Sequence, residues 1–203
     1  MGFYLCFKSK KFFYGGLSCG IALICEYPTF IISFFILLFF VHRKKLYLFL
    51  IPFLAFVSIA LVYNYLISGN PFDFPYNYVH SWPGSPWEEG ENAFKIKRIS
   101  IERLFNILFS PEFGFFIYSP VLLLCVFALV YNLIKKKSMR YSCFVLLILV
   151  CYIVFFMGVG IYYGGWGFGN RQLIPVIPFL LVAFATLSLI HISEPTRPLY
   201  ISY

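Results

Sequence analysis

A single arginine stands out among the few polar side chains that this chain places between its apolar stretches. Arg171 precedes an apolar stretch that starts at Pro175, and it follows four closely spaced glycines: Gly164, Gly165, Gly167 and Gly169. Glycines lack side chains, so a ligand can approach the backbone beside them. A guanidinium group donates two parallel hydrogen bonds to a phosphate. Arg171 is therefore a candidate phosphate contact, with an interfacial anchor or a structural ion pair as the alternative.

Three further residues are candidates for substrate binding: Glu26, Glu112 and His80. Glu26 interrupts a long apolar stretch, where an ionised side chain is costly and tends to mark function or pairing. The alternative for Glu26 is a buried structural hydrogen bond. His80 lies near three acids in sequence, but their spacing fits no defined metal site, so no metal is expected; these acids are Glu88, Glu89 and Glu91.

Long apolar runs, separated by short basic breaks, must position these residues. Residues 46–67, 115–134 and 141–161 each hold about 20 residues without charge, which spans a hydrocarbon core of roughly 30 Å at about 1.5 Å per residue. Hydrophobic residues make up 61% of the 203 residues and charged residues 12%, which is too little polar surface for a soluble globule. These features predict an all-α, polytopic transmembrane helical bundle with membrane lipid as its surroundings.

The basic residues indicate the orientation of this bundle. They gather beside the apolar runs in three clusters, namely Lys8, Lys10 and Lys11; Arg43, Lys44 and Lys45; and Lys135, Lys136, Lys137 and Arg140. Short loops rich in lysine and arginine stay in the cytoplasm. The net charge of +8 is thus explained by topology, and nucleic acid is not expected as a partner.

If all three clusters are cytoplasmic, residues 12–41 begin and end on the same side of the membrane. Residues 26–28 interrupt this stretch, because Pro28 removes a helix hydrogen bond and biases its predecessor away from the helical region. We therefore expect a hairpin of two short helices. One tilted or kinked helix, with the first cluster outside, is the alternative. Residues 46–67 then cross the membrane from the cytoplasm to the outside, and residues 115–134 cross back. Residues 141–161 cross to the outside again, and residues 175–186 return to the cytoplasm.

This topology places two polar segments outside, residues 68–112 and 162–172. The first is long for a turn, and loops of that size are usually functional. It ends in a predicted amphipathic helix on the membrane surface, with apolar residues at helical spacing; these are Ile96, Ile99, Ile101, Leu104, Phe105 and Leu108. Its basic side, which includes Arg103, is a candidate contact for anionic lipid or a lipid phosphate. A solvated connector without a ligand is the alternative.

Three stretches resemble one family. Residues 104–120 (LFNILFSPEFGFFIYSP) are similar to the "LFSPxxGxFxYSP" segment of bacterial multi-spanning glycosyltransferases of the GT-C type, which are themselves similar to dolichyl-phosphate-mannose protein mannosyltransferases. Residues 163–175 (YGGWGFGNRQLIP) resemble the family segment "GGWxxGxRxLxPxxPF", and residues 25–28 (CEYP) resemble an element that precedes both. The three elements follow the family order.

The resemblance implies transfer of a sugar from a polyprenyl-phosphate carrier to an acceptor at the outer face of a bacterial inner membrane. The donor would be a lipid-linked sugar, and no other cofactor is implied. In this family a carboxylate of the first external loop commonly acts as the base. That loop is expected upstream of residue 1, so we expect a fragment that is inactive without it. A non-enzymatic transporter or flippase segment is the alternative, which an inverted repeat would favour.

The end of the chain has a separate expectation. Residues 187–197 (LSLIHISEPTR) resemble the translation of a transposon-based sequencing adapter, and residues 201–203 match the start of the adjoining flow-cell sequence. We therefore expect the glycosyltransferase-like domain to comprise residues 1–186 and residues 187–203 to be an artefact. No function is expected for His191, Glu194 and Arg197.

Overall fold

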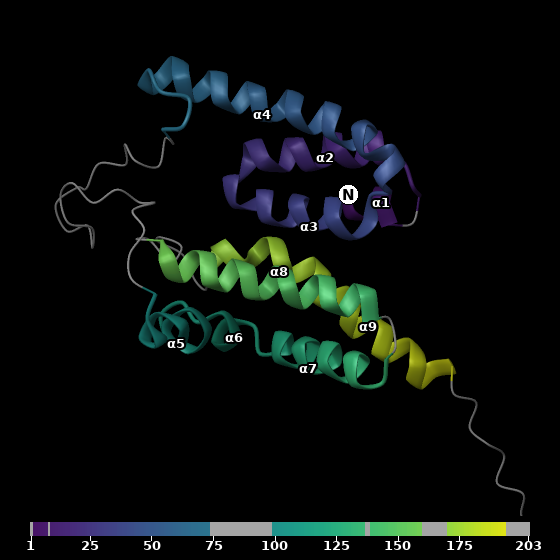
Figure 1. Ribbon diagram of the computed structural model, residues 1–203. Helices are drawn as coiled ribbons and strands as arrows, with labels where there is room; N and C mark the ends of the chain where they lie inside the picture. The colour runs from purple at the N-terminus through teal and green to yellow at the C-terminus, as the bar shows by residue number, and fades with distance from the viewer. Residues whose placement is uncertain (1, 8, 74–98, 137–138, 160–169, 194–203) are drawn as a thin grey trace, which may run out of the picture.

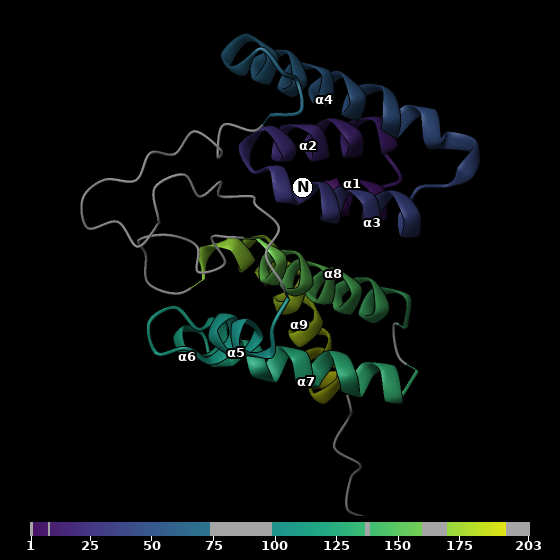
Figure 2. The same cartoon turned by 60° about the vertical axis from the view of Figure 1, so that its left-hand side comes forward.

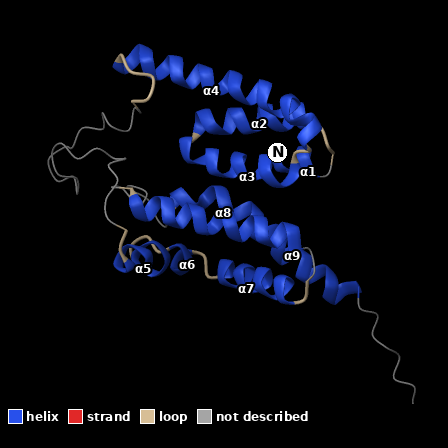
Figure 3. Cartoon of the chain, in the orientation of Figure 1, coloured by secondary structure: helices blue, strands red, loops and turns tan. Residues whose placement is uncertain are grey.

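The computed structural model describes residues 2–7, 9–73, 99–136, 139–159 and 170–193. All regular secondary structure in these ranges is helical, so the expected all-α class is confirmed (Figures 1 and 3). Within them, α4 (Leu46–Ser68) and α8 (Met139–Gly158) are long and apolar enough to cross a membrane. The other apolar helices are shorter.

The first part of the chain forms a helical hairpin. After α1 (Gly2–Phe7), α2 (Phe12–Cys25) ends at Glu26, whose extended backbone (φ −148°, ψ 108°) turns the chain. The short 3-10 helix η1 (Tyr27–Thr29) follows and leads into α3 (Phe30–Phe40), which runs back beside α2 (Figures 1 and 2). Pro28 fits the first turn of η1, where its missing N–H has no helical partner to lose. The break thus falls where the sequence predicts it.

Helix α4 packs closely against α2. The 3-10 helix η2 (Arg43–Lys45) precedes α4, and Gly69 ends α4 in the left-handed conformation (φ 74°) that favours glycine. A Cβ built on Gly16 of α2 would lie 2.1 Å from the backbone oxygen of Phe49, and one on Gly20 would lie 2.8 Å from the Phe56 side chain. Only glycines permit this approach. Such small-xxx-small spacing is typical of helix packing in membranes.

The second part of the chain contains a break that the sequence analysis did not expect. Residues 115–134 were predicted as one span, but the structure divides them into α6 (Phe115–Tyr118) and α7 (Val121–Ile134). The prediction was wrong because Pro120 disfavours the helical region for its predecessor, and Ser119 adopts φ −139° and ψ 68° instead. The remaining helices are α5 (Ile101–Phe109), η4 (Arg171–Val176) and α9 (Ile177–Ser193), which continues past residue 186.

The helices stack in layers, with α8 between the two parts of the chain. Helix α4 lies on α2, α3 follows and packs on α8, and α5, α6 and α7 lie on the other side of α8 (Figures 1 and 2). Helix α9 packs on α7 and α8. The most deeply buried hydrophobic side chains of α8 are Phe144, Val145, Ile148 and Tyr152. Residue burial therefore places the core along α8.

The two ends of this stack differ in charge. The start of α2, η2 and the α7–α8 connection lie at one end, which we call the basic end because it carries Lys10, Lys11, Lys44, Lys45, Lys135, Lys136 and Arg140 (Figures 1 and 2). Arg140 donates a hydrogen bond to the carbonyl of Phe39 and lies 5.5 Å from the ring centre of Phe40. The opposite end, called the loop end, holds the hairpin tip, the end of α4, α5 and the end of α8.

Candidate functional site

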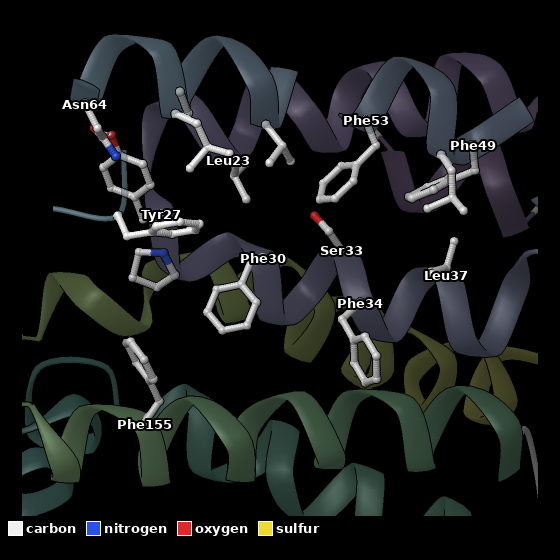
Figure 4. A pocket seen from close by; sticks show the side chains of 16 residues that line it. Leu23, Tyr27, Phe30, Ser33, Phe34, Leu37, Phe49, Phe53, Asn64 and Phe155 are labelled. Atoms are coloured by element: carbon white, nitrogen blue, oxygen red, sulfur yellow. Dashed lines mark hydrogen bonds between the residues drawn. The ribbon is translucent and has the colours of Figure 1, made fainter. Parts of the chain in front are cut away.

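A long apolar groove runs between α3 and α4 (Figure 4). It has a volume of about 590 Å³, within the range of roughly 300–1,000 Å³ that is usual for ligand pockets. Along α4 the lining side chains are Phe49, Leu50, Phe53, Val57, Ala60, Leu61 and Asn64. The facing wall comes mainly from the hairpin, from Leu23 to Leu37, and Phe155 of α8 completes one side.

The groove exists because α3 and α4 pack on different partners. Helix α4 is drawn onto α2 at Gly16 and Gly20, while α3 packs on α8. The α4 wall repeats every three or four residues and so occupies one helix face. The sequence could not indicate this face, because almost every position of α4 is apolar.

Polar groups gather at one end of the lining. The Tyr27 hydroxyl donates to Oδ1 of Asn64 at 3.0 Å, and Nδ2 of Asn64 donates to the Pro71 carbonyl at 3.3 Å. Asn64 is 1% exposed and lies about one turn from the end of α4, hence near the loop end. Farther along the groove, the Ser33 hydroxyl donates to the Thr29 carbonyl at 3.1 Å. The groove surface is therefore almost entirely apolar, and its polar side chains Tyr27, Ser33 and Asn64 are hydrogen-bonded within the protein.

Glu26 lies at the hairpin tip, immediately before Tyr27, and is exposed. The sequence predicts Glu26 at depth in a membrane, whereas the bond from Tyr27 to Asn64 places the tip beside the last turns of α4. The Glu26 carboxylate acts electrostatically on the hydroxyl of Tyr152 in α8. That hydroxyl is buried and makes no hydrogen bond within the described residues. Glu26 thus lies at the loop end, next to Tyr27 in sequence and outside the groove lining.

Arg171 is the first residue of η4 and is exposed. Its position is fixed by Asn170, whose Oδ1 accepts from the backbone N–H of Gln172 at 3.1 Å and caps the short helix. η4 packs on α8 and on α9, and its yellow-green start lies at the loop end (Figure 2). The part of the chain that the structure describes gives the Arg171 guanidinium no hydrogen bond or ion pair. This side chain is therefore open to an anionic ligand.

Glu112 belongs to a tight turn between α5 and α6. The backbone N–H of Gly114 donates to the Ser110 carbonyl at 2.7 Å, the N–H of Glu112 donates to Oγ of Ser110, and the Tyr118 hydroxyl donates to the Pro111 carbonyl. A Cβ on Gly114 would lie 2.4 Å from the oxygen of Ser110, so this turn requires glycine. The Glu112 side chain is exposed. Because α8 separates this layer from the hairpin, Glu112 does not join Glu26 at the groove.

Arg103 makes a contact that the sequence analysis did not foresee. Its Nη1 donates to the carbonyls of Met157 at 2.9 Å and Val159 at 3.2 Å, at the end of α8. A cation at a helix C-terminus is favoured by the helix dipole and by the unpaired carbonyls there. Arg103 belongs to the basic side that was expected to meet lipid phosphate. In the structure it connects α5 to α8 instead. On α5 the exposed side chains include Ile101 (85%) and Phe105 (60%).

The other predicted positions lie outside the described residues. They are His80 with Glu88, Glu89 and Glu91, and the glycines between 164 and 169. Among the residues that are described, no group of three or more His, Cys, Asp or Glu side chains is placed to hold a metal ion.

Comparison of the chain with protein-family models, with curated proteins and with solved structures gives no match. The loop end therefore has to be interpreted from its own residues. It holds the Tyr27–Asn64 end of the groove, and Glu26 and Arg171 lie at the same end of the molecule outside the groove lining, whereas Glu112 lies on the far side of α8.

Proposed function

We propose that the chain is part of a membrane glycosyltransferase, a hexosyltransferase that moves a sugar from a polyprenyl-phosphate carrier to an acceptor at the outer face of a bacterial inner membrane. In this proposal the helices form a multi-pass bundle, the basic end faces the cytoplasm and the loop end faces outward. Two observations support the membrane setting: α4 and α8 are long enough to span a bilayer, and large apolar side chains cover much of the surface.

The groove is the observation that carries the proposal. A lipid-linked sugar has a long hydrocarbon chain, and the groove offers an almost wholly apolar surface along its length. The chain would lie between α3 and α4. Its phosphate would meet Arg171 at the loop end, where the guanidinium can donate two hydrogen bonds.

Transfer requires that the acceptor oxygen bonds to the anomeric carbon while the bond from that carbon to the phosphate oxygen breaks. The polyprenyl phosphate leaves with the bonding electrons, and a base takes the acceptor proton. Arg171 would stabilise the charge that develops on the departing phosphate. Glu26 would accept hydrogen bonds from sugar hydroxyls. The exposed apolar residues Ile101 and Phe105 would hold α5 in the membrane interface.

Binding of a polyprenyl-phosphate hexose to the purified chain in lipid nanodiscs tests this function. Arg171→Lys keeps the charge but loses the planar fork, so we expect weaker binding by about 1 kcal/mol, and Arg171→Ala should weaken it further. Lys136→Ala at the basic end is the matched control and should bind like the wild type. Unchanged affinity in both Arg171 variants, with the helical content intact, would leave this residue as an interfacial anchor.

The alternative function, a flippase-like carrier, predicts a different result. The chain in vesicles would then exchange a fluorescent polyprenyl phosphate between the two leaflets, which a membrane-impermeant quencher reports. We expect no exchange above that of protein-free vesicles. Exchange at a rate that depends on Arg171 would contradict the transferase proposal and favour the carrier.

A further inference from the structure

We propose that the basic end of the molecule is a binding surface for the phosphate head groups of anionic phospholipids in the adjoining leaflet. Three connections form the surface, each with two exposed lysines: Lys10 and Lys11 before α2, Lys44 and Lys45 before α4, and Lys135 and Lys136 between α7 and α8. The inference goes beyond the proposed function, because it requires the helices to lie in a membrane but requires no sugar transfer.

Charge is separated between the two ends of the helix stack. The four acidic residues of the described part lie at the hairpin tip, just past α4, and in or just after α5, all towards the loop end (Figures 1 and 2); they are Glu26, Asp73, Glu102 and Glu112. The six lysine side chains of the basic end have no hydrogen bond or ion pair with another described residue. Their charge therefore has no counterion in the described part of the chain.

Arg140 differs from these lysines because it has a structural role. It donates to the carbonyl of Phe39, near the end of α3, and lies 5.5 Å from the ring centre of Phe40. The start of α8 is thereby joined to the end of α3, and η2 begins only three residues after Phe40. This contact brings the lysines of η2 and those of the α7–α8 connection onto adjacent parts of one surface.

Lys11 and Lys45 occupy positions that helix stability does not favour. Each is the N-cap residue of its helix, α2 or α4, and neither makes a capping hydrogen bond with its side chain. A helix N-terminus carries a partial positive charge, so a cation there is unfavourable, and Ser, Thr, Asp or Asn is the usual cap. The first turn of neither helix contains an acid. The helices themselves do not explain these two lysines.

Lys10 and Lys136 hold a backbone conformation that is unfavourable for lysine. Their φ angles are 53° and 54°, and within the described residues they are the only two non-glycine residues with positive φ. In this left-handed region a Cβ lies too close to the following carbonyl oxygen, which glycine avoids. Lys136 follows the C-cap of α7, and its N–H donates to the Leu133 carbonyl at 3.1 Å, at a position that is usually glycine.

These four lysines thus reduce the stability of the fold at the positions where they stand. A topology signal needs lysines near a membrane span, but it does not require them at N-caps or in left-handed turns. We therefore expect a compensating interaction with an anion outside the chain. An anionic leaflet provides one, because lysines at its surface are attracted to the lipid phosphates within about a Debye length.

Exposed apolar side chains beside the lysines favour a phospholipid over a soluble anion. Tyr47 follows the lysines of η2 and is 59% exposed, and Ile134 precedes Lys135 and is 72% exposed. A phospholipid carries its hydrocarbon tails directly below its phosphate, so one molecule can meet both kinds of side chain. Lysine stems can also lie along apolar surface while the ammonium group reaches the head groups.

Thermal unfolding of the full chain in nanodiscs tests this surface. The wild type should melt several degrees higher in phosphatidylcholine mixed with phosphatidylglycerol than in phosphatidylcholine alone, because a ligand of the folded state raises its stability. About 1 M salt should remove most of this gain, and inorganic phosphate added to phosphatidylcholine nanodiscs should not reproduce it. Absence of the gain, its persistence in high salt, or the same gain with inorganic phosphate would each overturn the proposal.

Replacing both strained lysines with glycine separates fold stability from lipid binding. Lys10→Gly with Lys136→Gly should raise the melting temperature in phosphatidylcholine by about 2–4 °C or more, because backbone strain is relieved. The same variant should lose about a third or more of the phosphatidylglycerol gain, since two of six lysines are gone. If it does not fold, the double asparagine variant replaces it, because asparagine tolerates the left-handed region.

Two controls accompany this variant. Lys10→Arg with Lys136→Arg keeps both the charge and the strain and should melt like the wild type in both lipids. Asn70→Asp lowers the net charge at the loop end while its Oδ1 still accepts from the Phe72 N–H, and it should keep the full phosphatidylglycerol gain. A glycine variant with the full gain, or an Asn70→Asp variant with an equal loss, would overturn the proposal.

The result is independent of the proposed function. Binding of the lipid-linked sugar is measured through Arg171 at the loop end, whereas the phosphatidylglycerol gain is measured through lysines at the basic end. Loss of either one leaves the other unaffected, so the two proposals can fail separately.

Discussion

Gly16 decides how closely α2 approaches α4, because a Cβ there would meet the backbone oxygen of Phe49 at 2.1 Å. A backbone oxygen cannot rotate away as a side chain can, so the helices themselves would have to separate. At Gly20 the nearest atoms belong to the Phe56 side chain, at 2.8 Å, and at Gly158 no atom of the described residues lies within 4 Å. The three glycines therefore form a graded series for one substitution.

We predict that Gly16→Ala lowers the free energy of unfolding by about 1–3 kcal/mol, the usual cost of overpacking a close contact. Gly20→Ala should cost less, because part of the Phe56 ring can move. Gly158→Ala should be neutral or slightly stabilising, since alanine favours a helix over glycine. Thermal unfolding in detergent, followed by circular dichroism, measures the order. Equal melting temperatures for all three variants would contradict this account of the α2–α4 contact.

At the scale of residues, the sequence indicates what chemistry a side chain can do, but it does not indicate which distant residues that side chain contacts. Arg171 was singled out as a phosphate contact, and in the described structure its side chain is exposed, while phosphate binding stays a prediction. Arg103 was grouped with a lipid-facing basic side, yet its carbonyl partners on α8 lie more than fifty residues away. Spacing along one helix cannot show such a contact. Gly16 and Gly20 were overlooked, although their spacing is a known signal in apolar helices.

At the scale of elements, Arg103 connects α5 to α8. Ser100 caps α5 by accepting from the backbone N–H of Arg103, while the Arg103 guanidinium reaches the carbonyls of Met157 and Val159. Ile107, which belongs to the same helix, has a fully buried side chain. One arginine thereby joins the start of α5 to the end of α8.

We predict that Arg103→Ala weakens the attachment of α5 by about 1–2 kcal/mol, because hydrogen bonds from a charged donor are worth more than neutral ones. Amide hydrogen exchange should then become about tenfold faster in α5 and in the last turn of α8. Arg103→Lys should show an intermediate effect, since it keeps the charge at the helix end. Glu102→Gln, at an exposed neighbouring position, is the control. Unchanged exchange in Arg103→Ala would show that apolar packing alone holds α5.

Elements were predicted well where a local signal marks their ends. Pro28 marked the hairpin, and Gly69 ends α4. The break at Ser119 had an equally local signal in Pro120, but the apolar character of residues 115–134 outweighed it in the sequence analysis. The groove had no such signal. In a uniformly apolar helix the periodicity cannot tell a packed face from an empty one, so the space between α3 and α4 depends on tertiary contacts.

At the scale of the whole molecule, the two ends of the helix stack define an orientation. The basic end gathers lysines and arginines from three separate parts of the chain. Of the arginines described at the loop end, Arg103 is engaged with α8 and Arg171 is exposed. Loops rich in lysine and arginine remain in the cytoplasm. The proposed reaction at the outer face depends on this orientation, because it requires Arg171 outside.

We predict that Cys25 reports the outer side. Cys25 is exposed at the hairpin tip beside Glu26, whereas Cys6, Cys19 and Cys125 are buried. In intact bacterial cells a membrane-impermeant maleimide should label Cys25, and Cys25→Ser should remove most of the labelling. A cysteine introduced by Lys136→Cys in the Cys25→Ser background should react only after the membrane is permeabilised, because it lies at the basic end. Reversed labelling would place Arg171 in the cytoplasm and exclude donor binding at the outer face. Labelling of both positions from outside would contradict the placement of the basic end and the loop end on opposite sides of the membrane.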